Sequence, residues 1–179
     1  MPHFFLASFM NLFADVALPT LDVKARTVLL AEGQVASHLY VVRQGCVRIW
    51  LNHRGKDLTA QFFVEGEAVA SLESFLTGEP SEFTIETVEA CTLDVLSKAE
   101  FDRLMAERPD FREWFQQLTT RRLIGYVHHL LAYIRDTPQE RYEDLVKNRP
   151  QLLQRVPQHY IASYLGITGV SLSRIRNRK

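Results

Sequence analysis

The hydrophobic pattern of this chain changes its period at Ser97, and this change limits the fold more than any other feature. Between residues 26 and 96, short β-branched and aromatic runs alternate with turn signals about every ten residues, such as Gly45, HRGK at 53–56 and Gly66. Such runs are typical of strands in a sandwich, barrel or jelly roll. After Ser97, apolar residues recur every three or four positions, which predicts helices. We therefore expect an α+β chain whose strands precede its helices.

Capping signals mark two helix starts. Ser97 is followed three residues later by Glu100, and Thr137 is followed by Pro138 and Glu140; both patterns are capping boxes. Between them, apolar residues spaced three and four apart from 110 to 135 predict one long helix. These residues occupy more than one side of the helix, so we expect part of it to contact something beyond its own domain.

The zero net charge hides two unequal parts. Residues 145–179 contain seven Lys and Arg residues and no Asp or Glu, so the rest of the chain holds 14 basic and 21 acidic residues. A basic end of this kind favours a polyanionic partner, whereas a basic tail without a partner is the alternative.

The basic end also carries a motif, because residues 158–177 fit two helices joined by a turn. Ala162 is small where the helices would cross, Gly166 allows positive φ in the turn, and Thr168 suits the cap of the second helix. The residues expected to be buried are Ile161, Leu165, Ile167, Leu172 and Ile175. This spacing matches a helix-turn-helix, and a purely structural hairpin would tolerate larger residues at 162 and 166.

We expect the second helix to read DNA with the side opposite its buried residues. Arg174 is the strongest candidate, because a guanidinium can bond a guanine edge in two places. The remaining major-groove candidates are Gly169, Val170, Ser173 and Asn177. The candidates for phosphate contacts, which position a protein without specifying sequence, are Thr168, Ser171, Arg176, Arg178 and Lys179. A solvated helix end is the alternative for Arg176 and Arg178.

Metal, cofactor and catalytic sites are not expected. Two cysteines, Cys46 and Cys91, are too few for an iron–sulfur cluster and are expected to be reduced thiols. A metal-dependent β-roll enzyme needs clustered histidines and a carboxylate, but His38 and His53 are well separated. The adjacent residues His128 and His129 would point about 100° apart on a helix and could not chelate one metal.

The N-terminal stretch MPHFFLASFMNLFADVALP is apolar, but it lacks the basic start of a signal peptide. Asp15 and Pro19 interrupt it well short of a membrane span. We expect an amphipathic helix packed on the domain, in a cytoplasmic protein without membrane contact.

In the order of its parts the chain resembles the Crp/Fnr family of bacterial transcription regulators. The resemblance rests on glycines within EGQ, VVRQGCV and FFVEGE, on the long helix, and on IASYLGIT followed by LSRIR. It implies a cyclic-nucleotide-binding-like jelly roll over 1–110, a dimerisation helix over 111–136 and a helix-turn-helix domain over 137–179. It also implies a homodimer that binds two-fold-symmetric double-stranded DNA and regulates RNA polymerase.

One departure concerns the effector. In cyclic-nucleotide-binding relatives a short helical cassette supplies a glutamate for the ribose and an arginine for the phosphate, and here Ser71 and Ser81 take these positions within ASLESFLTGEPSEFT. From 57 to 97 there are nine acids and no Lys or Arg. A buried phosphate without a cation is costly, so we do not expect cyclic AMP or cyclic GMP to bind. Another, unidentified effector, or none, could occupy a pocket near Ser71, Glu73, Ser74, Ser81 and Thr84.

A second departure concerns the DNA-binding end. We expect no wing hairpin after the last helix, and Gly169 and Val170 take the place of a Pro-Glu pair of the family. Glycine weakens the helix start by about 1 kcal/mol relative to alanine, whereas valine could contact a thymine methyl. A sensor or scaffold of the same fold that binds a small ligand or a protein, and not DNA, therefore remains the alternative.

Overall fold

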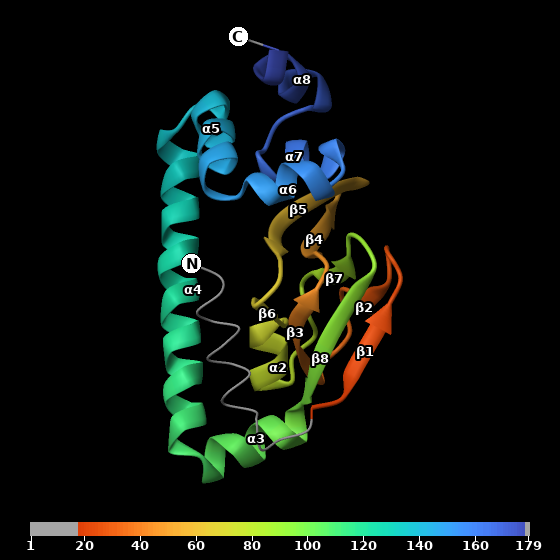
Figure 1. The fold of residues 1–179 in the computed structure, drawn as a ribbon, viewed down its shortest axis with the longest axis vertical. Coiled ribbons are helices and arrows are strands. Elements are labelled where there is room, and N and C mark those ends of the chain that lie inside the picture. The colour runs from red at the N-terminus through yellow and green to blue at the C-terminus, as the bar shows by residue number, and fades with distance from the viewer. Residues whose placement is uncertain (1–17, 178–179) are drawn as a thin grey trace. The chain divides into compact units, whose positions relative to one another are not determined.

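The computed structural model describes residues 18–177, which form two compact units divided between Arg108 and Pro109 (Figure 1). Residues 1–17, which hold nearly all of the helix predicted for the N-terminal stretch, lie outside the described residues. Among the residues described, no helix is both long and apolar enough to cross a membrane.

Unit 1 contains two antiparallel sheets of four strands each. In spatial order, one sheet consists of β1 (Thr20–Val23), β8 (Cys91–Ser97), β3 (His38–Gln44) and β6 (Ala68–Val69). The other consists of β2 (Val28–Leu30), β7 (Thr84–Thr87), β4 (Val47–His53) and β5 (Lys56–Phe63). This is a jelly-roll-like arrangement followed by helices, so the predicted α+β fold class is confirmed.

The core of unit 1 follows from strand register. Leu39 of β3 pairs with Leu96 of β8, and Val42 pairs with Leu93, and all four side chains are buried. The sequence FTIETVEACTLDVL contributes β7 to one sheet and β8 to the other. The chain changes sheets between Thr87 and Cys91. In this segment the Val88 N–H donates a hydrogen bond to the Cys46 carbonyl.

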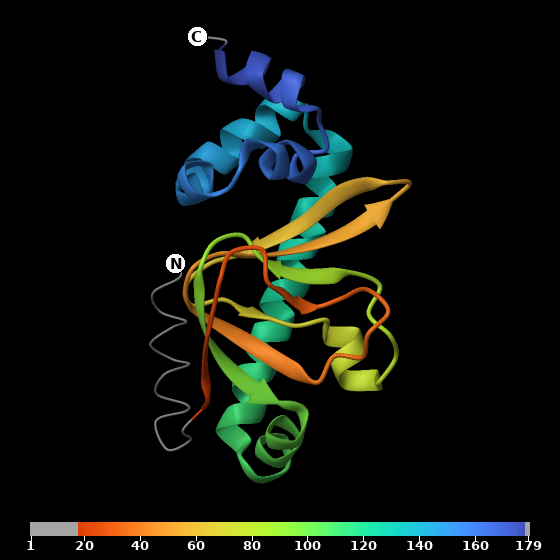
Figure 2. The same cartoon turned by 90° about the vertical axis from the view of Figure 1, so that its right-hand side faces the viewer.

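Turns shape both ends of this roll. Arg54 and Gly55 both have positive φ, as a two-residue β4–β5 hairpin requires, and Figure 2 shows this hairpin projecting beyond the sheets. The predicted turn at HRGK is therefore confirmed. A helix, α2 (Leu72–Thr77), follows β6 and ends at Gly78, which has φ 81°.

Helix α3 (Lys98–Glu107) closes unit 1. The Ser97 hydroxyl accepts a hydrogen bond from the Glu100 N–H, so the predicted N-cap is confirmed. Phe101 of α3 packs edge-on against Phe75 of α2, with ring centroids 5.1 Å apart. This contact joins α2 to the closing helix.

Unit 2 is helical: α4 (Pro109–Arg135), α5 (Pro138–Asn148), α6 (Pro150–Arg155), α7 (Gln158–Tyr164) and α8 (Gly169–Asn177). The long predicted helix is α4. The capping box at Thr137 is complete, because its hydroxyl accepts from the Glu140 N–H while the Glu140 carboxylate accepts from the Thr137 N–H. Helix α6 was not predicted; Pro150 occupies its first turn, where a missing N–H costs nothing.

Candidate functional site

The turn between α7 and α8 has the hydrogen bonds of a helix C-terminus closed by a left-handed residue. The Gly166 N–H donates to the Ser163 carbonyl at 2.9 Å, and the Ile167 N–H donates to the Ala162 carbonyl at 2.9 Å. Together these are the two bonds of a Schellman motif. Gly166 has φ 68°, as the sequence predicted. The turn angle between the two helices is therefore set by local backbone geometry.

The predicted buried positions divide into a core and an edge. Ile161, Ala162, Leu165 and Leu172 are at most 3% exposed. Ile167 and Ile175 are only half-buried. The first set holds α7 against α8, and Ile175 borders a groove described below.

The candidate reading residues of α8 share one outward side. Val170, Ser173, Arg174 and Asn177 are all exposed, and Gly169 is exposed at the start of the helix. We call these four side chains the reading face. Ser171 is half-buried, and Arg176 is exposed on another side of the helix. Arg178 and Lys179 lie outside the described residues.

Thr168 acts first as the cap of α8. Its hydroxyl accepts a hydrogen bond from the Ser171 N–H at 3.2 Å and lies 3.0 Å from the Ser171 hydroxyl. The predicted cap is confirmed. Both hydroxyls can still accept or donate one further bond, as a phosphate contact would need.

Four side chains, which we call the turn anchor, connect the α7–α8 turn to α4 and α5: His129, Tyr133, Arg141 and Tyr164. The Tyr133 hydroxyl donates to the Tyr164 carbonyl, and the Arg141 guanidinium lies over the Tyr133 ring at 4.7 Å. Arg141 also donates to the Leu165 carbonyl at 3.0 Å. The turn is thus held by hydrogen bonds to the carbonyls of Tyr164, the last residue of α7, and of Leu165, which caps that helix.

His129 stacks on Tyr164 with ring centroids 5.1 Å apart and meets Tyr133 edge-on at 5.0 Å. Burial lowers the pKa of His129, and the nearby Arg141 charge lowers it further. Burial raises the pKa of Tyr133. His128 and His129 point in different directions, as the sequence predicted: His129 belongs to the turn anchor, and His128 is exposed. His129 and Tyr133 lie four residues apart on α4, but their partners Arg141 and Tyr164 lie on other helices. The sequence alone carries too little signal to predict these contacts.

The predicted effector residues do not all meet. Ser71, Ser74, Ser81 and Thr84 are buried, whereas Glu73 is exposed. The hydroxyls of Ser71 and Ser81 lie 2.9 Å apart in a hydrogen bond, and Ser81 also lies 2.8 Å from the Phe83 carbonyl. The two residues that the resemblance aligns with a glutamate and an arginine are therefore joined here by a neutral contact.

The other hydroxyls of this region hold the loop before β3. Ser74 accepts from the Ala36 N–H at 2.9 Å, and Thr84 accepts from the Glu32 N–H at 3.1 Å. The backbone of Ser81 exchanges two hydrogen bonds with Gly33 and Gln34. These side chains thus have structural partners, and a cyclic phosphate would find serine hydroxyls and no arginine at this cassette.

A buried cation that sequence reasoning missed lies on β4. Arg48 is 2% exposed and donates to both oxygens of Asp57 at 2.7 Å and to Glu86 at 2.7 Å. Burial alone would lower the pKa of the Arg48 guanidinium, but these hydrogen bonds outweigh burial and raise it. Arg48 therefore neutralises two of the nine acids between 57 and 97, and its donors are directed at protein oxygens.

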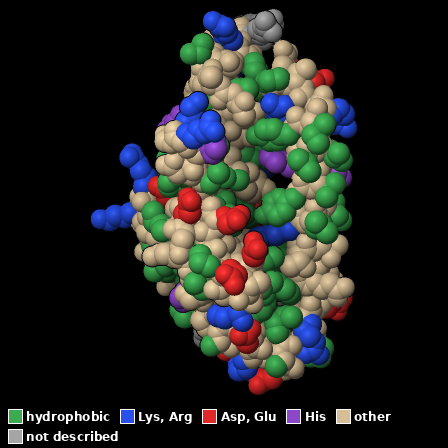
Figure 3. Space-filling model, turned by 180° about the vertical axis from the view of Figure 1, so that it is seen from behind, with side chains coloured by type: hydrophobic (Ala, Val, Ile, Leu, Met, Phe, Trp, Pro, Cys, Tyr) green, Lys and Arg blue, Asp and Glu red, His purple; other side chains and the backbone are tan. Residues whose placement is uncertain are grey.

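Within residues 18–177, no group of three or more His, Cys, Asp or Glu side chains is placed to hold a metal ion. Cys46 and Cys91 are buried free thiols. Figure 3 shows a group of acidic side chains on one face of unit 1, with Lys and Arg side chains on both units.

Comparisons with known proteins match the two parts of the chain differently. Residues 20–108 match the cyclic nucleotide-binding domain family. Patatin-like phospholipase domain-containing protein 6 of Homo sapiens is 33% identical over 88 residues, which are 48% of this chain and 6% of that protein. The Pongo abelii protein of the same name gives the same identity and coverage. The match thus spans a small part of the length of these relatives.

Solved structures match most of the chain. FixK2 from Bradyrhizobium japonicum aligns with a TM-score of 0.76 and 17% identity, covering 91% of this chain and 84% of FixK2. The c-di-GMP responsive global regulator CLP from Xanthomonas campestris aligns at 0.73 and 19% identity, covering 94% and 88%. A protein from Eubacterium rectale described as a transcriptional regulator of the Crp/Fnr family aligns at 0.72 and 17% identity, covering 94% and 80%. At these identities the shared property is the fold.

Proposed function

Because residues 20–108 form a domain of the cyclic nucleotide-binding type, on a chain with the fold of Crp/Fnr regulators, we propose that this protein is a dimeric, DNA-binding transcription regulator. It acts without catalysis, in the cytoplasm, on a two-fold-symmetric site where it contacts RNA polymerase. The observation that carries the proposal is the reading face, whose four side chains are exposed on a helix that packs against α7 through a buried core.

Arg174 reads a base edge in this proposal, and Val170, Ser173 and Asn177 complete the major-groove surface. Thr168, Ser171, Arg176 and Arg178 contact phosphates, which sets the register of α8 on the duplex. The excess of positive charge after residue 145 supports this assignment, since each neutralised phosphate releases counterions.

The dimer forms through α4. Leu123, Val127, Leu130 and Ile134 are 46–74% exposed and are spaced four, three and four residues apart. This is the spacing of a coiled-coil seam, and such a stripe is costly to leave in water. In Figure 3 hydrophobic side chains follow α4 along the right-hand side of the view. Two copies paired at this seam would present two recognition helices to one symmetric DNA site.

Cyclic AMP and cyclic GMP do not regulate the protein in this proposal. The support is the neutral Ser71–Ser81 hydrogen bond, together with the commitment of Arg48 to Asp57 and Glu86. A buried phosphate needs a paired cation, and the buried cation Arg48 of β4 already pairs with Asp57 and Glu86. Isothermal titration with each nucleotide checks this, and heat that saturates at one nucleotide per chain would contradict it.

The direct test is selection of duplexes from a random-sequence DNA library by the full chain. We expect a symmetric consensus, with affinity that falls steeply and linearly in a plot of log K against log salt. Arg174→Ala should weaken binding to the consensus by about tenfold or more, since a bidentate base contact contributes about 1–3 kcal/mol. Arg103→Ala removes the same charge from unit 1 and should leave binding unchanged.

Absence of any selected sequence, and of binding at ~50 mM salt, would favour the second reading, a sensor or scaffold that binds a ligand or protein in place of DNA. Equal losses for the two arginine variants would show that only overall charge matters and would remove Arg174 from base readout.

A further inference from the structure

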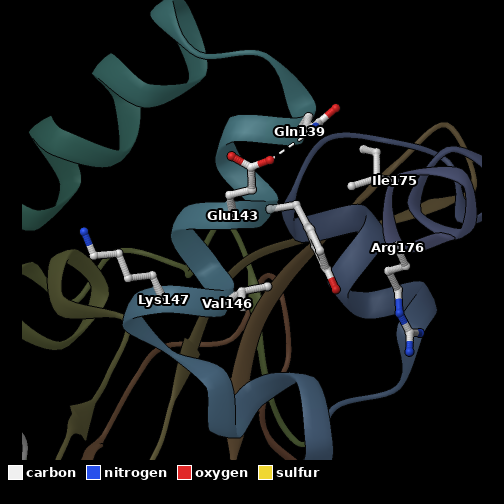
Figure 4. A pocket seen from close by; sticks show the side chains of 7 residues that line it. Gln139, Glu143, Val146, Lys147, Ile175 and Arg176 are labelled. Carbon is white, nitrogen blue, oxygen red and sulfur yellow. Dashed lines mark hydrogen bonds between the residues drawn. The ribbon is translucent and has the colours of Figure 1, made fainter. Parts of the chain in front are cut away.

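Helix α5 carries a stripe of side chains that its packing in unit 2 leaves open. Gln139, Tyr142, Glu143, Val146 and Lys147 fall at positions i, i+3, i+4, i+7 and i+8, which is one continuous helical face. Ile175 and Arg176 of α8 line the opposite wall. The cavity between them has a volume of about 350 Å³, and Figure 4 shows the side chains that line it. We call it the α5–α8 groove.

The middle of the groove is apolar. Val146 is 42% exposed, and Tyr142 and Ile175 are half-buried, so none of the three is fully covered by unit 2. Leu145, the residue before Val146 on the same helix, is buried and supplies the core contact of α5. The exposure of Val146 is therefore a property of a second face of α5. Apolar area rimmed by charged groups is typical of an interaction site.

The charges at the rim are unequal in availability. Glu143 accepts a hydrogen bond from the Gln139 amide at 3.0 Å. Lys147 and Arg176 have neither an ion pair nor a side-chain hydrogen bond among residues 18–177. Many other cations of unit 2 and α3, such as Arg141 and Arg103, are paired or hydrogen-bonded. The groove thus has two positive charges against one negative charge beside an apolar strip.

The groove faces away from the reading face. With about 100° between successive residues, Ile175 lies about 150° and Arg176 about 110° around α8 from the middle of the reading face. A duplex held by Val170, Ser173, Arg174 and Asn177 would leave the apolar strip uncovered. Phosphates also have no favourable contact with a valine, an isoleucine and a tyrosine ring, so DNA fits this surface poorly.

We infer that the α5–α8 groove docks an acidic amphipathic helix of a partner protein. Apolar residues one turn apart on that helix cover Val146 and the Tyr142 ring. Flanking carboxylates pair with Lys147 and, in a chain that is not bound to DNA, with Arg176. This is the helix-in-groove mode of recognition, in which anchors recur at i and i+4. The small size of the groove predicts a transient complex. The inference does not rest on the proposed DNA binding.

The test uses the full chain and a fluorescein-labelled helical peptide with two leucines four residues apart and four glutamates beside them. Binding is followed by fluorescence anisotropy. Val146→Asp should weaken peptide binding by about tenfold or more, which corresponds to about 1.4 kcal/mol. The matched control is Val170→Asp, because Val170 is also an exposed helical valine, at 63%. It should leave peptide affinity unchanged.

Charge exchange gives a second readout. Lys147→Glu should lower the affinity for the glutamate peptide and raise the affinity for a peptide whose glutamates are replaced by lysines. Replacing the peptide leucines by serine should abolish binding to every variant. Melting curves by circular dichroism establish that each variant is folded.

Peptide affinity that is equal for Val146→Asp and the parent chain, or that falls with Val170→Asp instead, would overturn the inference. Loss of DNA affinity in Val146→Asp and Lys147→Glu, with peptide affinity unchanged, would assign the groove to phosphates and would also overturn it. A parent chain that binds no DNA but binds the peptide through Val146 would refute the proposed function alone.

Discussion

Gly166 lies against the ring of Tyr133 so closely that a Cβ at position 166 would be 2.9 Å from Cε1 of that ring. The same residue has φ 68°, a conformation that L side chains rarely adopt. Two independent constraints therefore select glycine here, one from the backbone of the turn and one from the turn anchor on α4.

Gly166→Ala should destabilise unit 2 by about 2 kcal/mol or more, since a left-handed non-glycine residue alone costs about 1–2 kcal/mol and the Tyr133 ring must also move. Urea denaturation followed by far-ultraviolet circular dichroism measures the change. Specific DNA binding should fall together with stability, because the turn orients α8.

Gly169→Ala is the matched comparison. A Cβ at Gly169 would meet nothing within 4 Å, and the residue lies in the first turn of α8. We expect the free energy of unfolding to rise by up to about 1 kcal/mol, the difference in helix propensity. A loss of stability comparable with that of Gly166→Ala would show that the turn does not distinguish the two positions.

Arg48→Ala should destabilise unit 1 by about 3 kcal/mol, because it leaves the Asp57 and Glu86 carboxylates without the buried cation that pairs with both. Arg103→Ala is the control, since Arg103 also forms two ion pairs, with Glu100 and Glu107, but all on the surface. Its loss should be much smaller, because exposed pairs are screened by solvent. Chemical denaturation compares the free energies of unfolding of the two variants. Equal losses of stability would contradict a stabilising role specific to the buried ion pairs of Arg48.

The stability of unit 2 should decrease in acid because of His129. Its pKa is lowered in the folded state, first by burial and then by Arg141, while Tyr133 and Tyr164 pack against its ring. A group with a lowered folded pKa favours the neutral form, so its contribution is complete above pH 6.5, its ordinary value, and is lost as pH falls through the lower folded value.

The measurement is the free energy of unfolding of the parent chain and of His129→Gln between pH 8 and pH 5. The difference between the two proteins should shrink as the pH falls. His128→Gln, which changes the exposed neighbour, should run parallel to the parent chain throughout. A His128→Gln curve that accounts for the pH dependence would reject the assignment to His129.

Leu130→Asp should convert a dimer into monomers at micromolar concentration, raising the dissociation constant by about tenfold or more, because each copy loses an apolar contact of the seam. Sedimentation velocity measures it. Leu76→Asp changes an exposed leucine of α2 in unit 1 and should leave the association state as it is. A parent chain that sediments as a monomer at high concentration would contradict the seam.

The parts predicted from sequence are those that local patterns determine. The Thr137 box, the cap at Thr168 and the glycine turn at 166 each depend on residues within four positions of one another, and all three are confirmed. The change of period at Ser97 likewise predicted strands before helices. Such features need no knowledge of what lies elsewhere in the chain.

The parts that were missed depend on residues far apart in the sequence. Arg48 meets Asp57 and Glu86 only because β4 lies between β5 and β7, and a polar residue on an apolar strand gives no sign of its partners. The division of one strand pattern into β7 and β8 depends on which sheet each half joins. The contact of Tyr133 on α4 with Gly166 in the α7–α8 turn was missed likewise, because the two residues are far apart in the sequence.

The apolar seam on α4 has a consequence for control by dose. On the proposed function, the species that binds DNA is a dimer whose formation depends on the square of the monomer concentration, so halving the amount of chain lowers the dimer about fourfold where monomers predominate. On the same proposal no cyclic nucleotide regulates the protein, so its activity would follow its own rates of synthesis and degradation.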